Sequence, residues 1–242
     1  MTTRGRPACF INQWLWSLLD LLYPPSCGGC SARGARWCRK CQKAAVKIVP
    51  PFCPRCGLSQ SKAGLCSHCR KSPPQYTALR SWALFNRPVR HAIHRLKYYK
   101  DIALGEVLSR HLVTCLQTTD WVLDAVIPVP LGVARLAERG YNQASLLARP
   151  LALALGLDYQ PGGLQKIRDT PAQVGLSLEQ RKRNVAGSFQ AVSRTVAGSQ
   201  ILIVDDVSTS GATLNACADA LLSGGAEAVY AITLARASRH EI

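Results

Sequence analysis

The chain has 242 residues, of which 48% are hydrophobic, and a formal net charge of +16. This hydrophobic share is enough to bury a sizeable core. No stretch approaches the ~20 consecutive apolar residues that span a bilayer, which excludes a membrane-spanning protein. Nine of the eleven cysteines precede residue 70, so we expect two modules of different kinds.

The N-terminus does not read as a secretory signal. Arg4 and Arg6 precede only a short apolar run with no small-residue cleavage site. We therefore expect a cytoplasmic protein, in which paired cysteines are metal ligands rather than disulfides. The basic charge favours phosphate-bearing partners such as nucleic acid, nucleotides or anionic lipid. The alternative is a solvated basic surface with no dedicated partner.

Residues 1–25 are predicted to contain an amphipathic helix at 12–22, ended by Pro24 and Pro25. The simplest role for this helix is to pack on the rest of the protein. The alternative is a membrane-surface anchor with interfacial tryptophan, which would place the protein at the inner face of the cell membrane.

Residues 26–72 contain four CxxC pairs, and we expect them to form a zinc-ribbon module with two structural zinc ions. Two intervening residues let both sulfurs of a pair face one ion, and four thiolates complete a tetrahedral site. Short loops favour sequential pairing, although a cross-braced arrangement stays possible. His68 is expected to be a bystander and Cys9 a free thiol. The expected ligands are Cys27, Cys30, Cys38 and Cys41 for one ion, and Cys53, Cys56, Cys66 and Cys69 for the other.

Residues 75–242, after a Ser-Pro-Pro linker, alternate short apolar strands with helices. This order predicts an α/β domain with a mainly parallel sheet and helices on both faces. The predicted strands are 79–85, 121–127, 164–167, 188–192, 201–205 and 228–235, and the predicted helices are 89–97, 102–116, 142–155 and 212–222.

The most informative segment is 201–213. A buried strand leads to Asp205 and Asp206, and a loop of small residues then enters a helix. The N–H groups of such a loop and the helix N-terminus can hold a phosphate, while two carboxylates suit ribose hydroxyls with a magnesium ion nearby. The alternative is an ordinary helix N-cap after a strand. The predicted phosphate-binding residues are Ser208, Thr209, Ser210, Gly211, Ala212 and Thr213.

This segment resembles the phosphoribosyl-pyrophosphate motif of type I phosphoribosyltransferases. The wider chain resembles the competence protein F (ComF, also GntX-like) family. The matching segments are LYPPSC at 22–27, the four CxxC pairs, HRLKY at 94–98, IPVPL at 127–131, RLAERGYNQ at 135–143, RDTPAQ at 168–173 and LSLEQRKRN at 176–184. Pro150 departs from the expected pattern, because a helix-continuing residue would be expected there.

The resemblance implies a type I phosphoribosyltransferase-like fold, a phosphoribosyl pyrophosphate ligand with magnesium, and a link to DNA uptake and use, with DNA-uptake proteins as partners. The basic residues expected to reach pyrophosphate are Arg135, Arg139, Arg168 and Arg181, with Lys166 as a further residue of the closing loop.

Catalysis stays open at this stage, with Asp205 and Asp206 as the candidate catalytic residues. A pentosyl transferase, a nucleotide or single-stranded DNA binding protein, and a regulator that binds phosphoribosyl pyrophosphate without turnover all fit. The few aromatic residues are not interleaved with the basic runs, so the sequence does not indicate a base-stacking platform.

Overall fold

The structure is a computed structural model that describes residues 24–169 and 178–237. The helix predicted at 12–22 and Cys9 lie outside the described residues. Within these ranges, no helix is long and apolar enough to cross a membrane.

The centre of the molecule is a five-stranded sheet in the order β1-β7-β6-β2-β3. All four neighbouring pairs are parallel, which confirms the predicted sheet type. Parallel neighbours place the carboxyl ends of β2 and β6 at the same edge, where ligands of such sheets bind. The strands are β1 (Ala78–Leu84), β2 (Ala125–Pro128), β3 (Asp158–Tyr159), β6 (Gln200–Ser208) and β7 (Ala228–Arg236).

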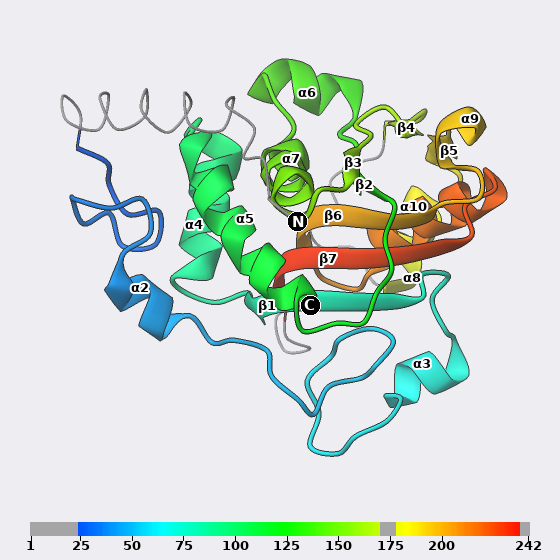
Figure 1. Cartoon of the computed structure of the whole chain (residues 1–242), viewed down its shortest axis with the longest axis horizontal. Helices are drawn as coiled ribbons and strands as arrows, with labels where there is room; N and C mark the ends of the chain where they lie inside the picture. The colour runs from blue at the N-terminus through cyan, green and yellow to red at the C-terminus, as the bar shows by residue number, and fades with distance from the viewer. Residues whose placement is uncertain (1–23, 170–177, 238–242) are drawn as a thin grey trace, which may run out of the picture.

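Helices cover both faces of the sheet, as predicted (Figure 1). One face carries α4 (Val89–Tyr98), α5 (Ala103–Leu116) and α7 (Gln143–Leu155). The other face carries α10 (Ala212–Ser223). Helix α8 (Leu178–Val185) and the antiparallel pair of strands β4 and β5 lie beside α10. The remaining elements are α2 (Arg39–Ala44), α3 (Ser67–Lys71), α6 (Val133–Arg139), α9 (Ser193–Val196), β4 (Leu164–Lys166) and β5 (Phe189–Ala191).

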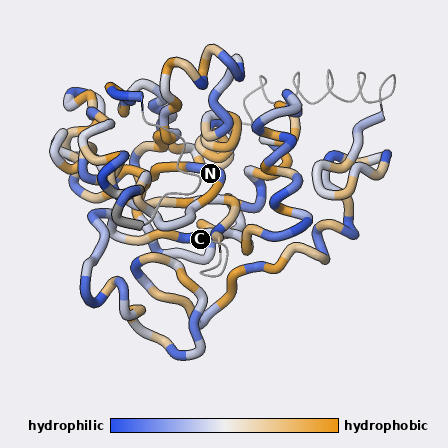
Figure 2. The backbone as a smooth tube through the Cα atoms, turned by 180° about the vertical axis from the view of Figure 1, so that it is seen from behind, coloured by the Kyte–Doolittle hydropathy of each residue, from blue (hydrophilic) through white to orange (hydrophobic). Residues whose placement is uncertain are grey.

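Strand β6 shows why this sequence forms a central strand. Ile201, Leu202, Ile203 and Val204 are all 0% exposed, and alternate residues belong to the cores on opposite faces. Such a strand would expose apolar side chains to water at a surface, because both of its faces are apolar, so it is buried at the centre of the sheet. Figure 2 shows the hydrophobic residues gathered along the inner strands and helices, with hydrophilic residues in the outer loops.

Several element boundaries differ from the prediction. Strand β6 runs to Ser208, beyond the predicted end at Asp205, so Asp206 also lies within the strand. Strand β2 begins only at Ala125, four residues later than expected. Helix α6 was not predicted, because it has no buried residue and therefore no apolar periodicity.

Helix α7 continues through Pro150. Proline lacks the N–H that would bond to the carbonyl four residues earlier, which here is Leu146. Gly105 of α5 packs against that residue: a Cβ atom there would lie 2.9 Å from the Leu146 carbonyl oxygen. The close approach of α5 thus covers the carbonyl that Pro150 leaves without its helical donor.

The cysteine-rich module covers the outer edge of β1. The Ile48 N–H donates to the Trp82 carbonyl at 3.0 Å, and the Leu84 N–H donates to the Val46 carbonyl at 2.9 Å. Further along, the Leu79 N–H donates to the Arg55 carbonyl at 2.8 Å. These bonds occupy the strand edge, which would otherwise be open to pairing with another chain.

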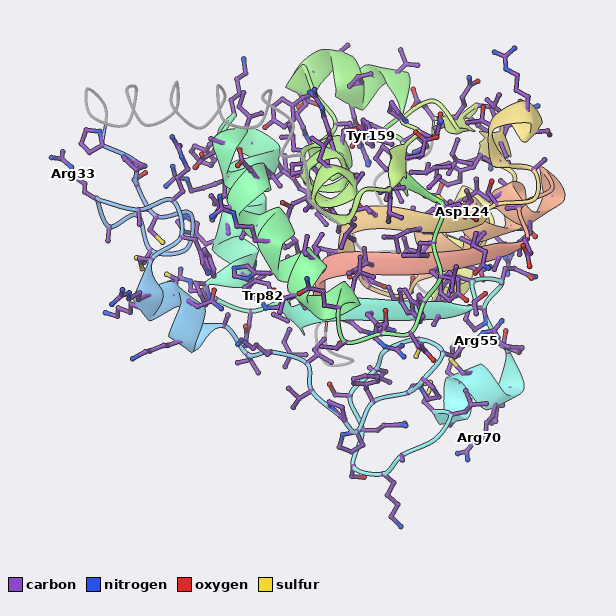
Figure 3. All side chains as sticks on the ribbon, viewed as in Figure 1. Arg33, Arg55, Arg70, Trp82, Asp124 and Tyr159 are labelled. Atoms are coloured by element: carbon purple, nitrogen blue, oxygen red, sulfur yellow. The ribbon has the colours of Figure 1, made fainter. Side chains whose placement is uncertain are left out.

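An aromatic cluster joins the first half of this module to the sheet. The rings of Trp82 and His111 are stacked with centroids 4.0 Å apart, and Trp37 meets Trp82 edge-on at 6.0 Å. Figure 3 shows Trp82 beside helix α5. Burial lowers the pKa of His111 to about 4, so the imidazole is neutral in this apolar contact.

Candidate functional site

The eight paired cysteines form two separate clusters. In each cluster the four Sγ atoms lie within 4.8 Å of one another. This geometry confirms the predicted sequential pairing, and four thiols at such distances suit tetrahedral zinc. The first cluster is Cys27, Cys30, Cys38 and Cys41, and the second is Cys53, Cys56, Cys66 and Cys69.

Backbone donors prepare these thiols for metal binding. The Cys41 N–H donates to Cys38 Sγ at 3.4 Å and lowers the pKa of that thiol to about 7. The Cys69 N–H donates in the same way to Cys66 Sγ at 3.5 Å. His68 is exposed and belongs to neither cluster, as expected for a bystander.

The segment after β6 has the geometry of an anion-binding loop. Gly211 adopts φ +81°, a conformation that favours glycine, and α10 begins at the next residue. Among the described residues, the N–H groups of Thr209, Ser210 and Gly211 have no hydrogen-bond acceptor. Three consecutive unpaired N–H groups at the positive end of a helix attract an anion such as phosphate.

The two acids beside this loop are not equivalent. Asp206 is buried, and its Oδ2 forms an ion pair with Lys97 Nζ of α4 at 2.6 Å. Asp205 is partly exposed, and its Oδ1 accepts the Asp206 N–H at 2.8 Å. Asp205 is therefore the carboxylate that a ligand can reach.

Burial and neighbouring charge shift the pKa values of Asp205 and Lys97. Burial, followed by the charge of Asp206, raises the pKa of Asp205 well above its ordinary value. Burial acts to lower the pKa of Lys97, but the Asp206 carboxylate outweighs burial and the pKa ends above its ordinary value. Lys97 therefore stays charged in its ion pair with Asp206.

The basic residues predicted to reach pyrophosphate occupy different environments. Arg139 is partly buried, donates to Gln143 Oε1 and lies over the Tyr98 ring at 5.3 Å. Arg135 is exposed on α6. The Arg168 guanidinium donates to the Ala186 carbonyl at 2.7 Å, which ties the segment after β4 to the end of α8.

Lys166 and Arg181 complete this set. Burial lowers the pKa of Lys166, and the positive charge of Arg135 adds to the effect, which places the two residues near each other. Arg181 lies on α8, but its side chain lies outside the described residues. A Cβ atom at Gly132 would collide with the Asp169 carboxylate, so the segment after β4 closes over the β2–α6 loop.

Comparison with known protein families separates the cysteine-rich module from the α/β domain. A family described as "Double zinc ribbon domain" matches residues 18–70, and one described as "Phosphoribosyl transferase domain" matches residues 124–241.

Three relatives extend the comparison over most of the chain. DNA utilization protein YhgH of Salmonella typhimurium is 34% identical and covers 82% of this chain and 89% of its own. Competence protein F of Haemophilus influenzae is 31% identical over 83% of this chain and 90% of its own. Competence protein ComFC of Bacillus subtilis is 27% identical over 94% of this chain and 91% of its own.

The chain belongs to the ComF family. In this ComF protein the structure adds residues that the sequence did not single out as site residues. Arg236 of β7 donates to Ser208 Oγ at 3.2 Å, and the Tyr76 hydroxyl lies 3.2 Å from the position of a Cβ atom at Gly211. No local motif marks either residue, because each reaches the loop from a distant part of the chain.

An aromatic and basic surface also forms at the end of α4. The ring centroid of His94 lies 4.8 Å from that of Tyr98 and 5.7 Å from that of Tyr99. Tyr98 and Tyr99 are 62% and 67% exposed, and Arg139 lies over Tyr98. The sequence shows these residues on two separate segments, and only the fold brings them together.

Proposed function

We propose that this ComF protein binds phosphoribosyl pyrophosphate at the loop after β6 and acts in DNA uptake or utilisation. The observation that supports the ligand is the row of three unpaired N–H groups beside an accessible carboxylate, at the carboxyl end of a parallel sheet. The names of the relatives support the biological role.

In this proposal the 5′-phosphate lies in the loop of residues 208–213, and Asp205 accepts a hydrogen bond from a ribose hydroxyl. Asp206 acts as a positioning residue through its bond to Lys97. Magnesium is commonly held by one or two carboxylates together with ligand phosphates, and Asp205 fits that role. The ion would supply positive charge to the pyrophosphate group.

The pyrophosphate group is proposed to face α6. Arg139 lies close enough to Lys97 for its charge to act on the pKa of that lysine, so both cations border the two acids. Two further cations are proposed to reach the pyrophosphate: Arg135 from the exposed helix α6 and Lys166 from strand β4. Arginine suits this position because its fork of donors matches phosphate oxygens.

We propose single-stranded DNA as a second ligand, contacted by the platform of His94, Tyr98, Tyr99 and Arg139. Exposed aromatic rings stack on bases of any sequence, and neighbouring cations contact the backbone. The net charge of +16 supports the same partner. This role places the protein in the cytoplasm, at the inner face of the membrane where DNA-uptake proteins would be its partners.

Calorimetry tests the ligand assignment, and chemistry tests turnover. Phosphoribosyl pyrophosphate with magnesium should bind wild type, and ribose 5-phosphate should bind more weakly because it lacks the pyrophosphate. Release of pyrophosphate with an added nucleobase would identify a transferase. Tight binding without release would identify a sensor or binding protein.

A further inference from the structure

The phosphate loop opens on a cavity of about 1060 Å³ that lies outside the ribose and pyrophosphate positions proposed above. Thr209, Ser210 and Gly211 form one part of its wall, and the second cysteine cluster forms another. Pockets that hold drug-sized ligands have volumes of about 300–1,000 Å³, so this space is far larger than one phosphate group needs.

Arg236 places a buried cation in the wall of this cavity, beside the second cysteine cluster. The residue is 7% exposed, and its buried Nε has no hydrogen-bond partner. Its single contact to the loop is the bond to Ser208 Oγ at 3.2 Å, and no carboxylate pairs with it among residues 24–169 and 178–237. A buried N–H group without an acceptor is costly, and an anion bound in the cavity would supply the acceptor.

Tyr76 adds a second buried donor on the same side of the loop. The residue is 2% exposed, lines the cavity, and its hydroxyl has no partner in the described part of the chain. A tyrosine hydroxyl can donate a hydrogen bond to an anion. The hydroxyl lies 3.2 Å from the point where a Cβ atom at position 211 would be, which is next to the unpaired N–H groups of the loop.

Beyond these donors the cavity is partly apolar. Pro73 and Pro74 of the linker lie on one side, and Val185 and Ala186 after α8 on another. Asn215 and Asp219 of α10 add an amide and a carboxylate. Apolar side walls with a few polar groups suit a nucleoside, whose base has flat faces and polar edges.

We propose that this cavity binds a nucleoside attached to the loop-bound phosphate, so that the loop accepts a phosphodiester as well as a terminal phosphate. The inference rests on the proposed phosphate site and names a further ligand class for it. A dinucleotide would place its phosphate on the loop, Arg236 and Tyr76, with one nucleoside over Asp205 and the other in the cavity.

Calorimetry of the full-length, zinc-loaded chain with ribose 5-phosphate and with the dinucleotide thymidylyl-thymidine tests the proposal. Ala216→Phe fills the cavity from α10, and Ala220→Phe places the same side chain one turn further along the helix, away from the cavity. We expect Ala216→Phe to weaken the dinucleotide about tenfold or more and to spare ribose 5-phosphate, with Ala220→Phe changing neither.

Tyr76→Phe removes only the hydroxyl, and should weaken both ligands about two- to tenfold. Tyr141→Phe is its matched control, because the Tyr141 hydroxyl bonds to the Leu96 carbonyl on α4. If Ala216→Phe does not fold, Ala186→Phe fills the cavity from the opposite wall with the same expected result.

Three results would overturn the proposal. Wild type that binds ribose 5-phosphate but ignores the dinucleotide would leave the proposed function intact and limit the loop to terminal phosphates. Dinucleotide binding that survives cavity filling would place the second nucleoside elsewhere. Wild type that binds neither ligand would contradict the proposed phosphate site itself.

Discussion

Lys97 and Asp206 are joined across α4 and β6 by an ion pair of 2.6 Å, with side-chain exposures of 24% and 4%. The pair ties the helix to the strand that carries the phosphate loop. The pair occupies the Asp206 carboxylate, whereas the neighbouring Asp205 is partly exposed.

Lys97→Met should destabilise the protein, because it leaves the Asp206 charge buried without a partner. Breaking a buried pair from one side costs about 3–5 kcal/mol, whereas replacing both partners by apolar residues is often neutral. Lys97→Met with Asp206→Leu should therefore recover most of the loss in urea denaturation. Arg110→Met, which breaks the exposed pair with Glu106, is the control and should cost about 0.2–1 kcal/mol.

Equal instability of the single and double Lys97 variants would show that the lysine acts through packing rather than charge.

Zinc content tests the two cysteine clusters. Elemental analysis should give about two zinc ions per chain, and Cys66→Ser should lower this to about one. Because a Cβ atom at Gly57 would lie 2.6 Å from the Leu79 carbonyl, the second cluster presses directly on β1. We therefore expect Cys66→Ser to reduce the stability of the sheet as well. A well-folded, metal-free protein would contradict the assignment.

The pH dependence of stability tests the environment of Asp205. Burial and the charge of Asp206 raise the pKa of Asp205, so the folded protein keeps this proton longer than the unfolded chain does. Its stabilising contribution is present in acid and is lost as pH rises through the raised pKa. The free energy of unfolding of Asp205→Asn should therefore improve relative to wild type as pH rises above about 4, the ordinary pKa of an unfolded aspartate.

Urea denaturation of both proteins at each pH measures this difference. A difference that is constant across the range would show that Asp205 titrates normally.

Salt dependence tests the proposed DNA platform. Binding of an unstructured oligonucleotide should weaken steeply from about 50 to about 200 mM salt. Tyr98→Ala with Tyr99→Ala should remove about 1–3 kcal/mol per stacked base while leaving the salt slope largely unchanged. Tyr159→Ala on the edge strand β3 serves as the control for loss of a tyrosine side chain outside the platform. Salt-independent binding, or none at low salt, would contradict the platform.

Much of this architecture is visible in the sequence because its signals are local. CxxC spacing predicts the zinc clusters, and the apolar run at 201–204 predicts a central strand followed by a phosphate loop. The ion pair from Lys97 to Asp206 and the approach of Arg236 to Ser208 depend on which strands are neighbours. Residues far apart in the chain carry no shared pattern, so only the fold reveals these contacts.

The exposed residues were hard to predict for a related reason. Helix α6 has no buried face, and the tyrosines at the end of α4 are exposed where aromatic residues are usually buried. Hydrophobic periodicity reports burial, and it gives no signal for exposed elements.

Calorimetric titration of phosphoribosyl pyrophosphate with magnesium into wild type, Asp205→Asn, Ser208→Ala and Gly211→Val tests the central claim most directly. Valine at φ +81° is strained by about 1–3 kcal/mol and its Cβ meets the Tyr76 hydroxyl, so Gly211→Val should abolish binding. Asp205→Asn should weaken binding about ten- to a hundredfold, and Ser208→Ala only mildly, because backbone N–H groups hold the phosphate. Wild type that ignores the ligand at about 1 mM, or a Gly211→Val protein that binds like wild type, would contradict the account.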